Sequence, residues 1–264
     1  MRRAVKLLLG CALAFCLAAT GLAESAIEGL SPLQILLQAR LMFPREQLTI
    51  RGRVGTAEQR GQREKLFPYT LNLDWSTAAP LAHCRLYALE GSGDTPLQEA
   101  ELTRVGGKPK LTLITSEGKR VEQAHLNTPI AESDLTWMDL AFDYLWWQDL
   151  RTVPEEECRK REIPRRVSGR SAAVIEARPP EPIAGLSAVR IWVDEATGNL
   201  LQTAQLDEAG EVARLMYVQK IGREEGRWVP REFRIKRTGS SRITRLTVSS
   251  ITADSFSVED TADD

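Results

Sequence analysis

The sequence predicts a mainly β (α+β) fold: a curved antiparallel sheet, or incomplete β-barrel, with helices over its open concave face. Apolar and polar residues alternate with period two through most of the chain after residue 47, as in strands with one buried face. Short connectors that contain Gly separate these segments, which favours hairpins between antiparallel neighbours. Few segments have helical spacing, so the apolar face of the sheet must curl and be covered by those few helices.

The composition is that of a globular protein and excludes several classes. The 264 residues carry 35 Lys+Arg and 36 Asp+Glu, a formal net charge of -1, with 42% hydrophobic and 27% charged residues. A disordered chain would have fewer apolar residues. A nucleic-acid partner is not expected, because phosphate contacts need clustered Lys and Arg.

Residues 1–23 have the pattern of a signal peptide. Arg2, Arg3 and Lys6 precede an uncharged, mostly apolar run, and small residues precede a cut ahead of Glu24. We therefore expect export to the periplasm. An uncleaved anchor and a lipid-modified cysteine stay open as alternatives, although the apolar run is shorter than the roughly 20 residues of a spanning helix.

The mature chain begins with a helix. Ser31 can cap free N–H groups, Pro32 fits the first turn, and Pro44 ends the segment. The residues expected on its apolar face are Leu33, Leu36, Leu37 and Leu41. This face must pack against another element.

Strands follow on both sides of a central segment. The first lies after residue 47, and in the second Tyr69, Leu71, Leu73 and Trp75 alternate with polar residues. Further strands are expected at 84–89, 99–103, 110–115, 188–193, 200–205, 212–221, 228–236 and 243–251. No fixed-period repeat or Pro/Ser-rich linker interrupts them, so residues 24–256 are expected to form a single domain. The acidic tail at 257–264 lacks a hydrophobic pattern and is expected to be flexible.

The central segment, residues 127–150, is unusually rich in tryptophan. Ser133 and Asp134 are candidate N-caps for a helix that begins near Leu135, and apolar residues cover much of its circumference. Such a helix needs protein on two sides, or protein on one side and a ligand on the other. Two interpretations follow: a core helix beneath the sheet, or a lid over an apolar cavity.

The octet 133–140, Ser-Asp-Leu-Thr-Trp-Met-Asp-Leu, resembles a pattern of the bacterial outer-membrane lipoprotein-sorting superfamily (LolA-like), in its broad and poorly characterised branch. Trp192-Val193-Asp194 with the turn at Gly198, and Trp228-Val229-Pro230, are also similar to that branch. The resemblance covers most of the mature chain. It implies a half-barrel with an apolar cavity for acyl chains, in a periplasmic carrier or binder that contributes to lipoprotein sorting.

The resemblance implies an acylated lipoprotein or lipid as partner, with envelope transport proteins as further candidates, in a monomeric protein without a cofactor. A similar architecture also serves as an envelope sensor or protein-interaction module without lipid transport, and this alternative stays open. The residues expected to line the apolar cavity or lid are Leu71, Leu73, Trp75, Leu135, Trp137, Met138 and Leu140. Asp134 and Asp139, with Ser133, are expected to cap or hold the loop.

Catalysis is not expected. Asp139 and Asp143 are four residues apart, as in paired carboxylates, but exposed acids on an amphipathic helix are far commoner. His83 lies beside Cys84, yet two histidines supply a metal site poorly. After export a Cys84–Cys158 disulfide is chemically allowed, and the sequence leaves its formation open. The basic stretch 161–166 is interpreted as a solvated edge or loop, with contact to anionic headgroups or a partner as the alternative.

Overall fold

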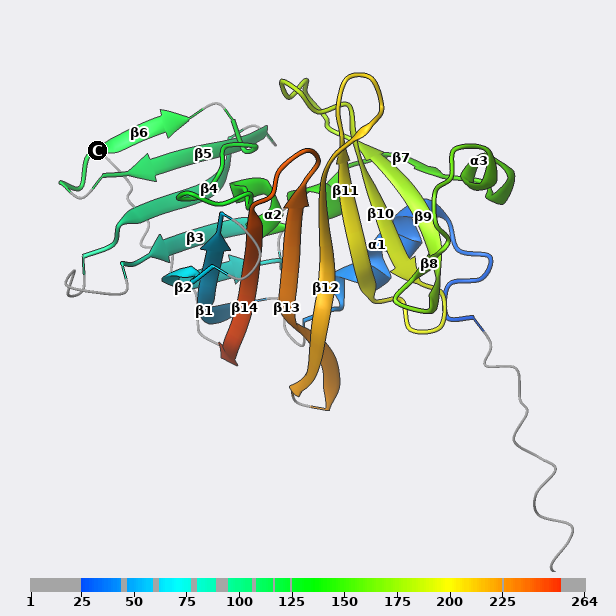
Figure 1. The fold of residues 1–264 in the computed structure, drawn as a ribbon, viewed down its shortest axis with the longest axis horizontal. Coiled ribbons are helices and arrows are strands. Elements are labelled where there is room, and N and C mark those ends of the chain that lie inside the picture. Colours follow the sequence, from blue (N-terminus) through cyan, green and yellow to red (C-terminus); the bar gives the residue numbers. More distant parts are fainter. Residues whose placement is uncertain are drawn as a thin grey trace, which may run out of the picture.

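One open antiparallel sheet dominates the molecule (Figure 1). A computed structural model describes residues 25–43, 47–58, 62–76, 80–88, 95–105, 108–115, 117–123, 125–224 and 226–252. The expected signal peptide and the acidic tail lie outside these residues. Along the sheet the strand order is β6-β5-β4-β3-β2-β1-β14-β13-β12-β11-β10-β9-β7, and β8 pairs with β9 off this path. The sheet has two free edges and does not close into a barrel, which confirms the predicted fold class.

Most neighbours in the sheet are also neighbours in sequence, as expected for hairpins. The strands of the first part are β1 (Gln47–Ala57), β2 (Lys65–Asp74), β3 (Leu81–Leu86), β4 (Gln98–Val105), β5 (Lys108–Ile114) and β6 (Arg120–Gln123). Those of the second part are β7 (Asp149–Thr152), β8 (Arg166–Val167), β9 (Arg170–Arg178), β10 (Ala188–Asp194), β11 (Leu200–Leu206), β12 (Val212–Glu224), β13 (Arg227–Arg237) and β14 (Ile243–Thr252). Pairing of β1 with β14 joins the two parts.

Helix α1 (Pro32–Arg40) begins as the sequence predicts. Ser31 caps it in a capping box with Gln34, which satisfies free backbone donors of the first turn. The predicted apolar face is right for Leu36 and wrong for the other three leucines, because the buried residues are Ile35, Leu36 and Ala39. The leucines left exposed are Leu33, Leu37 and Leu41. Ala39 lies on the buried face of the helix, and the spacing of the leucines alone does not predict this orientation.

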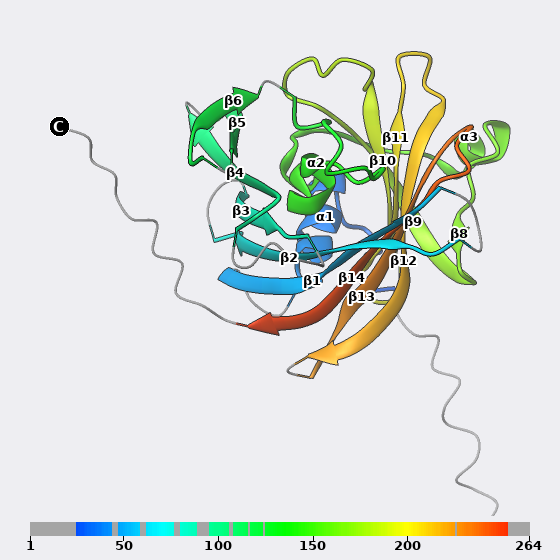
Figure 2. The ribbon, with the colours of Figure 1, turned by 60° about the vertical axis from the view of Figure 1, so that its left-hand side comes forward.

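The central segment is not one continuous helix. Thr136, rather than Ser133 or Asp134, caps the five-residue helix α2 (Trp137–Ala141). Phe142 then has φ 53° and ψ 36°, a left-handed conformation that ends α2 before the 3₁₀ helix η1 (Asp143–Trp146). A buried aromatic residue in this region is uncommon, so tertiary packing of Phe142 determines the break. The sheet curves around α1 and α2, which lie on its concave side (Figure 2).

The two faces of the sheet bury separate apolar clusters. On β9 and β10, Ile175 and Ile191 belong to the main concave cluster, whereas their alternates Val174 and Trp192 belong to a second cluster. The second cluster includes Cys158 of the short helix α3 (Glu155–Lys160). Helix α3 therefore covers the convex face near β8 and β9, opposite to α1 and α2.

Candidate functional site

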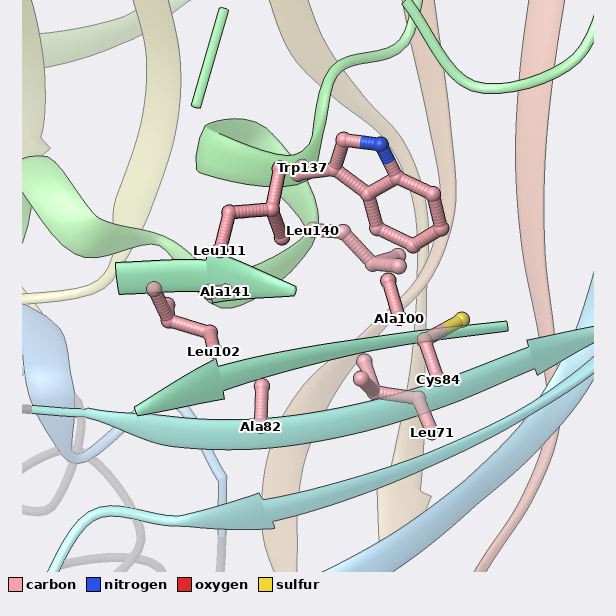
Figure 3. A pocket seen from close by; sticks show the side chains of 9 residues that line it. All are labelled: Leu71, Ala82, Cys84, Ala100, Leu102, Leu111, Trp137, Leu140 and Ala141. Carbon is pink, nitrogen blue, oxygen red and sulfur yellow. The ribbon is translucent and has the colours of Figure 1, made fainter. Parts of the chain in front are cut away.

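A small apolar cavity separates α2 from the concave face of strands β2 to β5 (Figure 3). Side chains from the four strands point toward side chains of α2 across it. Its lining residues are Leu71, Ala82, Cys84, Ala100, Leu102, Leu111, Trp137, Leu140 and Ala141. We call this interface the α2 seam. The small side chains of Ala82, Ala100 and Ala141 leave the space that the larger ones do not fill.

The cavity is too small for an acyl chain as it stands. Its volume is about 10 Å³, at the lower limit of the room that a single water needs. The lining carries almost no polar surface, and a cavity of this kind tends to stay dry. The expected acyl-chain cavity is thus closed in this structure, and a ligand can enter only if α2 and the strands move apart.

Three of the seven residues predicted for the apolar site line the α2 seam: Leu71, Trp137 and Leu140. Leu73, Leu135 and Met138 are fully buried in the surrounding core instead. The sequence prediction missed Ala82, Ala100, Leu102, Leu111 and Ala141. Alternation with polar residues on the predicted strand 99–103 could have identified Ala100 as inward-facing, but not as a cavity wall.

Trp75 lies away from the seam, in an aromatic cluster beside the end of α1. Its ring centroid is 5.4 Å from that of Phe43, 6.0 Å from Phe142 and 5.0 Å from Trp146. The guanidinium of Arg40 lies 4.4 Å from the Trp146 ring centroid, in a cation–π geometry. Phe142 occupies the centre of this cluster, which explains the forced break in the central segment.

Buried polar contacts attach the α2 segment to strands β12 to β14. Arg214 of β12 lies 2.6 Å from the Asp139 carboxylate and donates to the Asp134 carbonyl at 2.6 Å. Arg237 of β13 donates to the Asp134 carboxylate at 3.1 Å, and the Thr244 hydroxyl of β14 accepts from the Asp134 N–H. This side of α2 is therefore held by several charge-assisted hydrogen bonds, the strong kind.

Within the same segment, Ser133 donates its hydroxyl to the Ile130 carbonyl at 2.6 Å and accepts from the Leu135 N–H. Asp139 accepts hydrogen bonds from the Thr136 N–H and hydroxyl, which completes the capping box of α2. Ser133, Asp134 and Asp139 thus have structural partners in the fold.

The opposite side of α2 makes few polar contacts with strands β3 to β6, which we call the β3–β6 wing. Arg104 of β4 pairs with Asp143 of η1, and Asp143 also accepts from the Trp147 indole N–H at 2.9 Å. The Gln98 side chain accepts from the Ala131 N–H. The rest of the α2 seam is apolar, so α2 is bound more strongly to β12–β14 than to the wing.

The expectation that Asp139 and Asp143 are exposed is wrong. Each residue is 1% exposed, because protein encloses the α2 segment on both sides. They pair with different arginines, Arg214 and Arg104, on opposite sides of the segment. The two carboxylates are therefore committed to separate ion pairs rather than to shared acid–base work.

Cys84 and Cys158 are free and buried, so the disulfide between them that the sequence left open is not formed in this structure. Cys84 belongs to the main cluster and lines the α2 seam, whereas Cys158 belongs to the cluster on the convex face. Burial raises the pKa of both thiols, and the charge of Glu99 raises that of Cys84 further. A raised pKa keeps a thiol protonated and unreactive.

The remaining polar candidates have acidic partners within this chain. His83 lies 2.7 Å from the Glu99 carboxylate. Within the described part of the chain, no three His, Cys, Asp or Glu residues gather as metal ligands. In the basic stretch, Arg161 pairs with Glu157 and Glu176, and Arg165 pairs with Glu155 and Glu195. The stretch follows α3 as a partly exposed turn, and acids of this chain compensate these two arginines.

An open antiparallel sheet wrapped around a short helical segment defines a LolA-like fold, and solved structures share it. A putative outer-membrane lipoprotein-sorting protein domain from Vibrio parahaemolyticus has a TM-score of 0.67 and 12% identity, over 86% of this chain and 94% of its own. A LolA superfamily protein from Nitrosomonas europaea has a TM-score of 0.66 and 12% identity, over 86% and 96%. A DUF1329 family protein from Desulfovibrio piger has a TM-score of 0.66 and 13% identity, over 86% and 93%.

These neighbours confirm the resemblance to the lipoprotein-sorting superfamily at the level of the fold. A family model described as "Uncharacterized protein" matches residues 115–260, and the chain belongs to that family. No curated protein sequence matches the chain. Among the described residues, every helix is too short or too polar to cross a bilayer.

Proposed function

We propose that the protein is a periplasmic carrier or binder of lipid acyl chains, in free lipid or acylated lipoprotein, and that the acyl chain enters the α2 seam. The observation that carries this proposal is the seam itself: an apolar interface beside a helix whose polar attachments concentrate on its other side. An interface with few hydrogen bonds can open without leaving many buried polar groups unpaired.

The energetics favour opening when a ligand is present. Burial of about 14 methylene groups contributes on the order of 11 kcal/mol relative to water, at ~0.8 kcal/mol for each. Parting the wing from α2 breaks the Arg104–Asp143 pair and exposes the seam. Breaking this partly buried ion pair costs ~2 kcal/mol, which is less than burial of the acyl chain contributes, so the chain can offset the opening and still bind.

The fold neighbours support the same class of function. One of them is titled as a putative outer-membrane lipoprotein-sorting protein domain, and another as a LolA superfamily protein. Binding of an acyl chain in an apolar site requires no catalytic group, metal or cofactor. We therefore propose that the protein is not an enzyme. The signal-peptide pattern at 1–23 supports export, with 24–256 as a single domain and 257–264 as a tail.

Filling the seam tests this proposal. Ala100→Leu places a larger side chain against α2, and Ala188→Leu makes the same change in the convex-face cluster, away from the seam. Native mass spectrometry of periplasm-purified protein, and titration with a fluorescent fatty acid, then measure bound acyl chains. Thermal unfolding of both variants shows whether overpacking, typically about 1–3 kcal/mol, has affected them equally.

We expect acylated species with the wild-type protein and with Ala188→Leu, and at least a tenfold loss of affinity with Ala100→Leu. Equal binding by all three proteins would move the site away from the seam. Absence of acyl chains from every preparation and titration would refute the carrier proposal. The fold would then serve a sensor or protein-interaction module, the alternative function.

A further inference from the structure

The end of the β12–β13 hairpin projects beyond the neighbouring strands (Figures 1 and 2). Strand β13 pairs with β14 only from Glu232 to Ile235, and β12 pairs with β11 only from Val212 to Tyr217. Beyond these limits the two strands pair with each other, down to Glu224 and Arg227. We call residues 220–231 the hairpin tip, and its described residues, 220–224 and 226–231, form a two-stranded ribbon with little support from the rest of the sheet.

The hairpin tip exposes large apolar side chains. Ile221 is 55% exposed and Trp228 is 50% exposed, whereas Val229 is fully buried and anchors the base of the tip. Ile221 pairs with Pro230 and Arg223 pairs with Trp228, so Ile221, Arg223 and Trp228 share one face of the ribbon. The other five tryptophans of the chain are at most 8% exposed. Trp228 is therefore the one tryptophan whose indole ring is substantially exposed to solvent.

The charges of the tip are of the opposite sign to those of the whole chain. Residues 220–231 contain four Lys or Arg and two Glu, whereas the chain has a formal net charge of -1. Lys220 pairs with Glu232 and Arg231 pairs with Glu224. The Arg223 guanidinium lies 5.2 Å from the Trp228 ring centroid, and no acid among the described residues pairs with it. Arg223 thus presents its charge beside the exposed indole.

We infer that the hairpin tip docks on a membrane surface that contains anionic lipid, with Trp228 and Ile221 among the headgroups and Arg223 near a lipid phosphate. Indole rings favour the bilayer interface, where one side is apolar and the other is wet. Each Lys or Arg near an anionic leaflet is attracted to it. The described part of the tip is a two-stranded ribbon that presents Ile221, Arg223 and Trp228 on one face.

The tryptophan inventory provides a specific assay. Because Trp228 is the one half-exposed indole among six, quenching by lipids brominated on their acyl chains reports on Trp228 rather than on buried rings. The probes are vesicles of phosphatidylcholine alone and with 30% phosphatidylglycerol, and co-sedimentation measures the bound fraction independently. Free phosphate as a competitor distinguishes a surface from an isolated phosphate site.

The variants separate the tip from general apolar exposure. Trp228→Ser and Arg223→Glu alter the tip, and Leu97→Ser alters another exposed apolar residue, 52% exposed, outside the hairpin. We expect Trp228 quenching and binding to anionic vesicles, roughly tenfold weaker binding for each tip variant, and unchanged binding for Leu97→Ser. Higher salt should weaken binding, whereas millimolar phosphate at constant ionic strength should not.

Absence of binding to anionic vesicles, or equal binding by Trp228→Ser and the wild-type protein, would overturn the inference. Loss of a co-purifying protein with the tip variants, without vesicle binding, would assign the tip to a protein partner and also overturn it. Acyl-chain uptake by the α2 seam in vesicle-free solution should be normal in both tip variants. Failure of the docking surface and failure of the carrier proposal are therefore measured separately.

Discussion

Arg104→Met should increase the population of the state in which the α2 seam is open, without unfolding the protein. The substitution keeps most of the aliphatic stem and removes the guanidinium that pairs with Asp143 across the seam. Cys84 lines the seam on β3 and is 2% exposed, so a thiol reagent reaches it only when the wing and α2 separate. The alkylation rate of Cys84 under native conditions therefore reports the population of the open state.

The size of the effect follows from the burial of the pair. Removing one partner of a buried ion pair costs about 3–5 kcal/mol. The Arg104 side chain is 15% exposed and Asp143 retains the Trp147 indole N–H, so we take a value of ~2 kcal/mol for the closed state. At 1.4 kcal/mol for each factor of ten, the open population and the alkylation rate should increase roughly 30-fold.

Peptide mass spectrometry measures alkylation of the Cys84 peptide against time, and urea unfolding measures global stability. Arg120→Met is the matched control, because Arg120 pairs with Glu101 inside the wing and its side chain is 60% exposed. The control should leave the Cys84 rate nearly unchanged. Equal rates in the two variants, or a Cys84 rate that follows global unfolding, would refute the reasoning that the seam is the weaker side of α2.

Three further changes test the fold. Gly52→Ala should strongly lower the free energy of unfolding in urea, since a Cβ there would lie 1.8 Å from a backbone carbonyl oxygen of β14. Gly55→Ala is the control and should lower it less, because its Cβ meets the end of a glutamate side chain. Phe142→Ala should cost about 3–5 kcal/mol in the same assay, and a loss below 1 kcal/mol would show that Phe142 does not hold the central segment. Hydrogen bonds from Arg151 lower the pKa of Glu157 to about 2. The ionised Glu157 carboxylate therefore stabilises the fold above the unfolded pKa of about 4.5, and this stabilisation is lost as pH falls toward 2. Glu157→Gln should weaken the dependence of the unfolding free energy on pH over that interval, and an unchanged dependence would contradict this prediction.

The strands of the C-terminal third were predictable because each has a period of two and ends at a connector with Gly. Expected ranges such as 200–205 and 243–251 differ from the observed strands by at most one residue at either end. Strand β9 was missed, since Ala172 to Ala177 reads as a nearly continuous apolar run and both of its faces are covered. A strand buried on both faces has no alternation to detect.

The central segment shows where local patterns are insufficient. Its helical spacing predicted a helix through Phe142, but contacts with Phe43, Trp75 and Phe233, which are distant in sequence, favour a left-handed residue there. The buried state of Asp139 likewise depends on Arg214, a partner that no local window contains. The α2 seam forms because small residues on separate strands lie against one helix. This arrangement depends on how the strands pair, which the sequence pattern does not give.

The pairing of β1 with β14 makes the last strand of the chain the bridge between its two halves. Thr49 to Ala57 align with Ile243 to Thr252, so the paired residues are about three quarters of the sequence apart. Closing so long a loop slows folding, and the join cannot form until synthesis has reached β14. A chain truncated after β13 would contain two separate half-sheets with unpaired edge strands. Any truncation before residue 243 should therefore produce a protein that aggregates rather than a smaller folded domain.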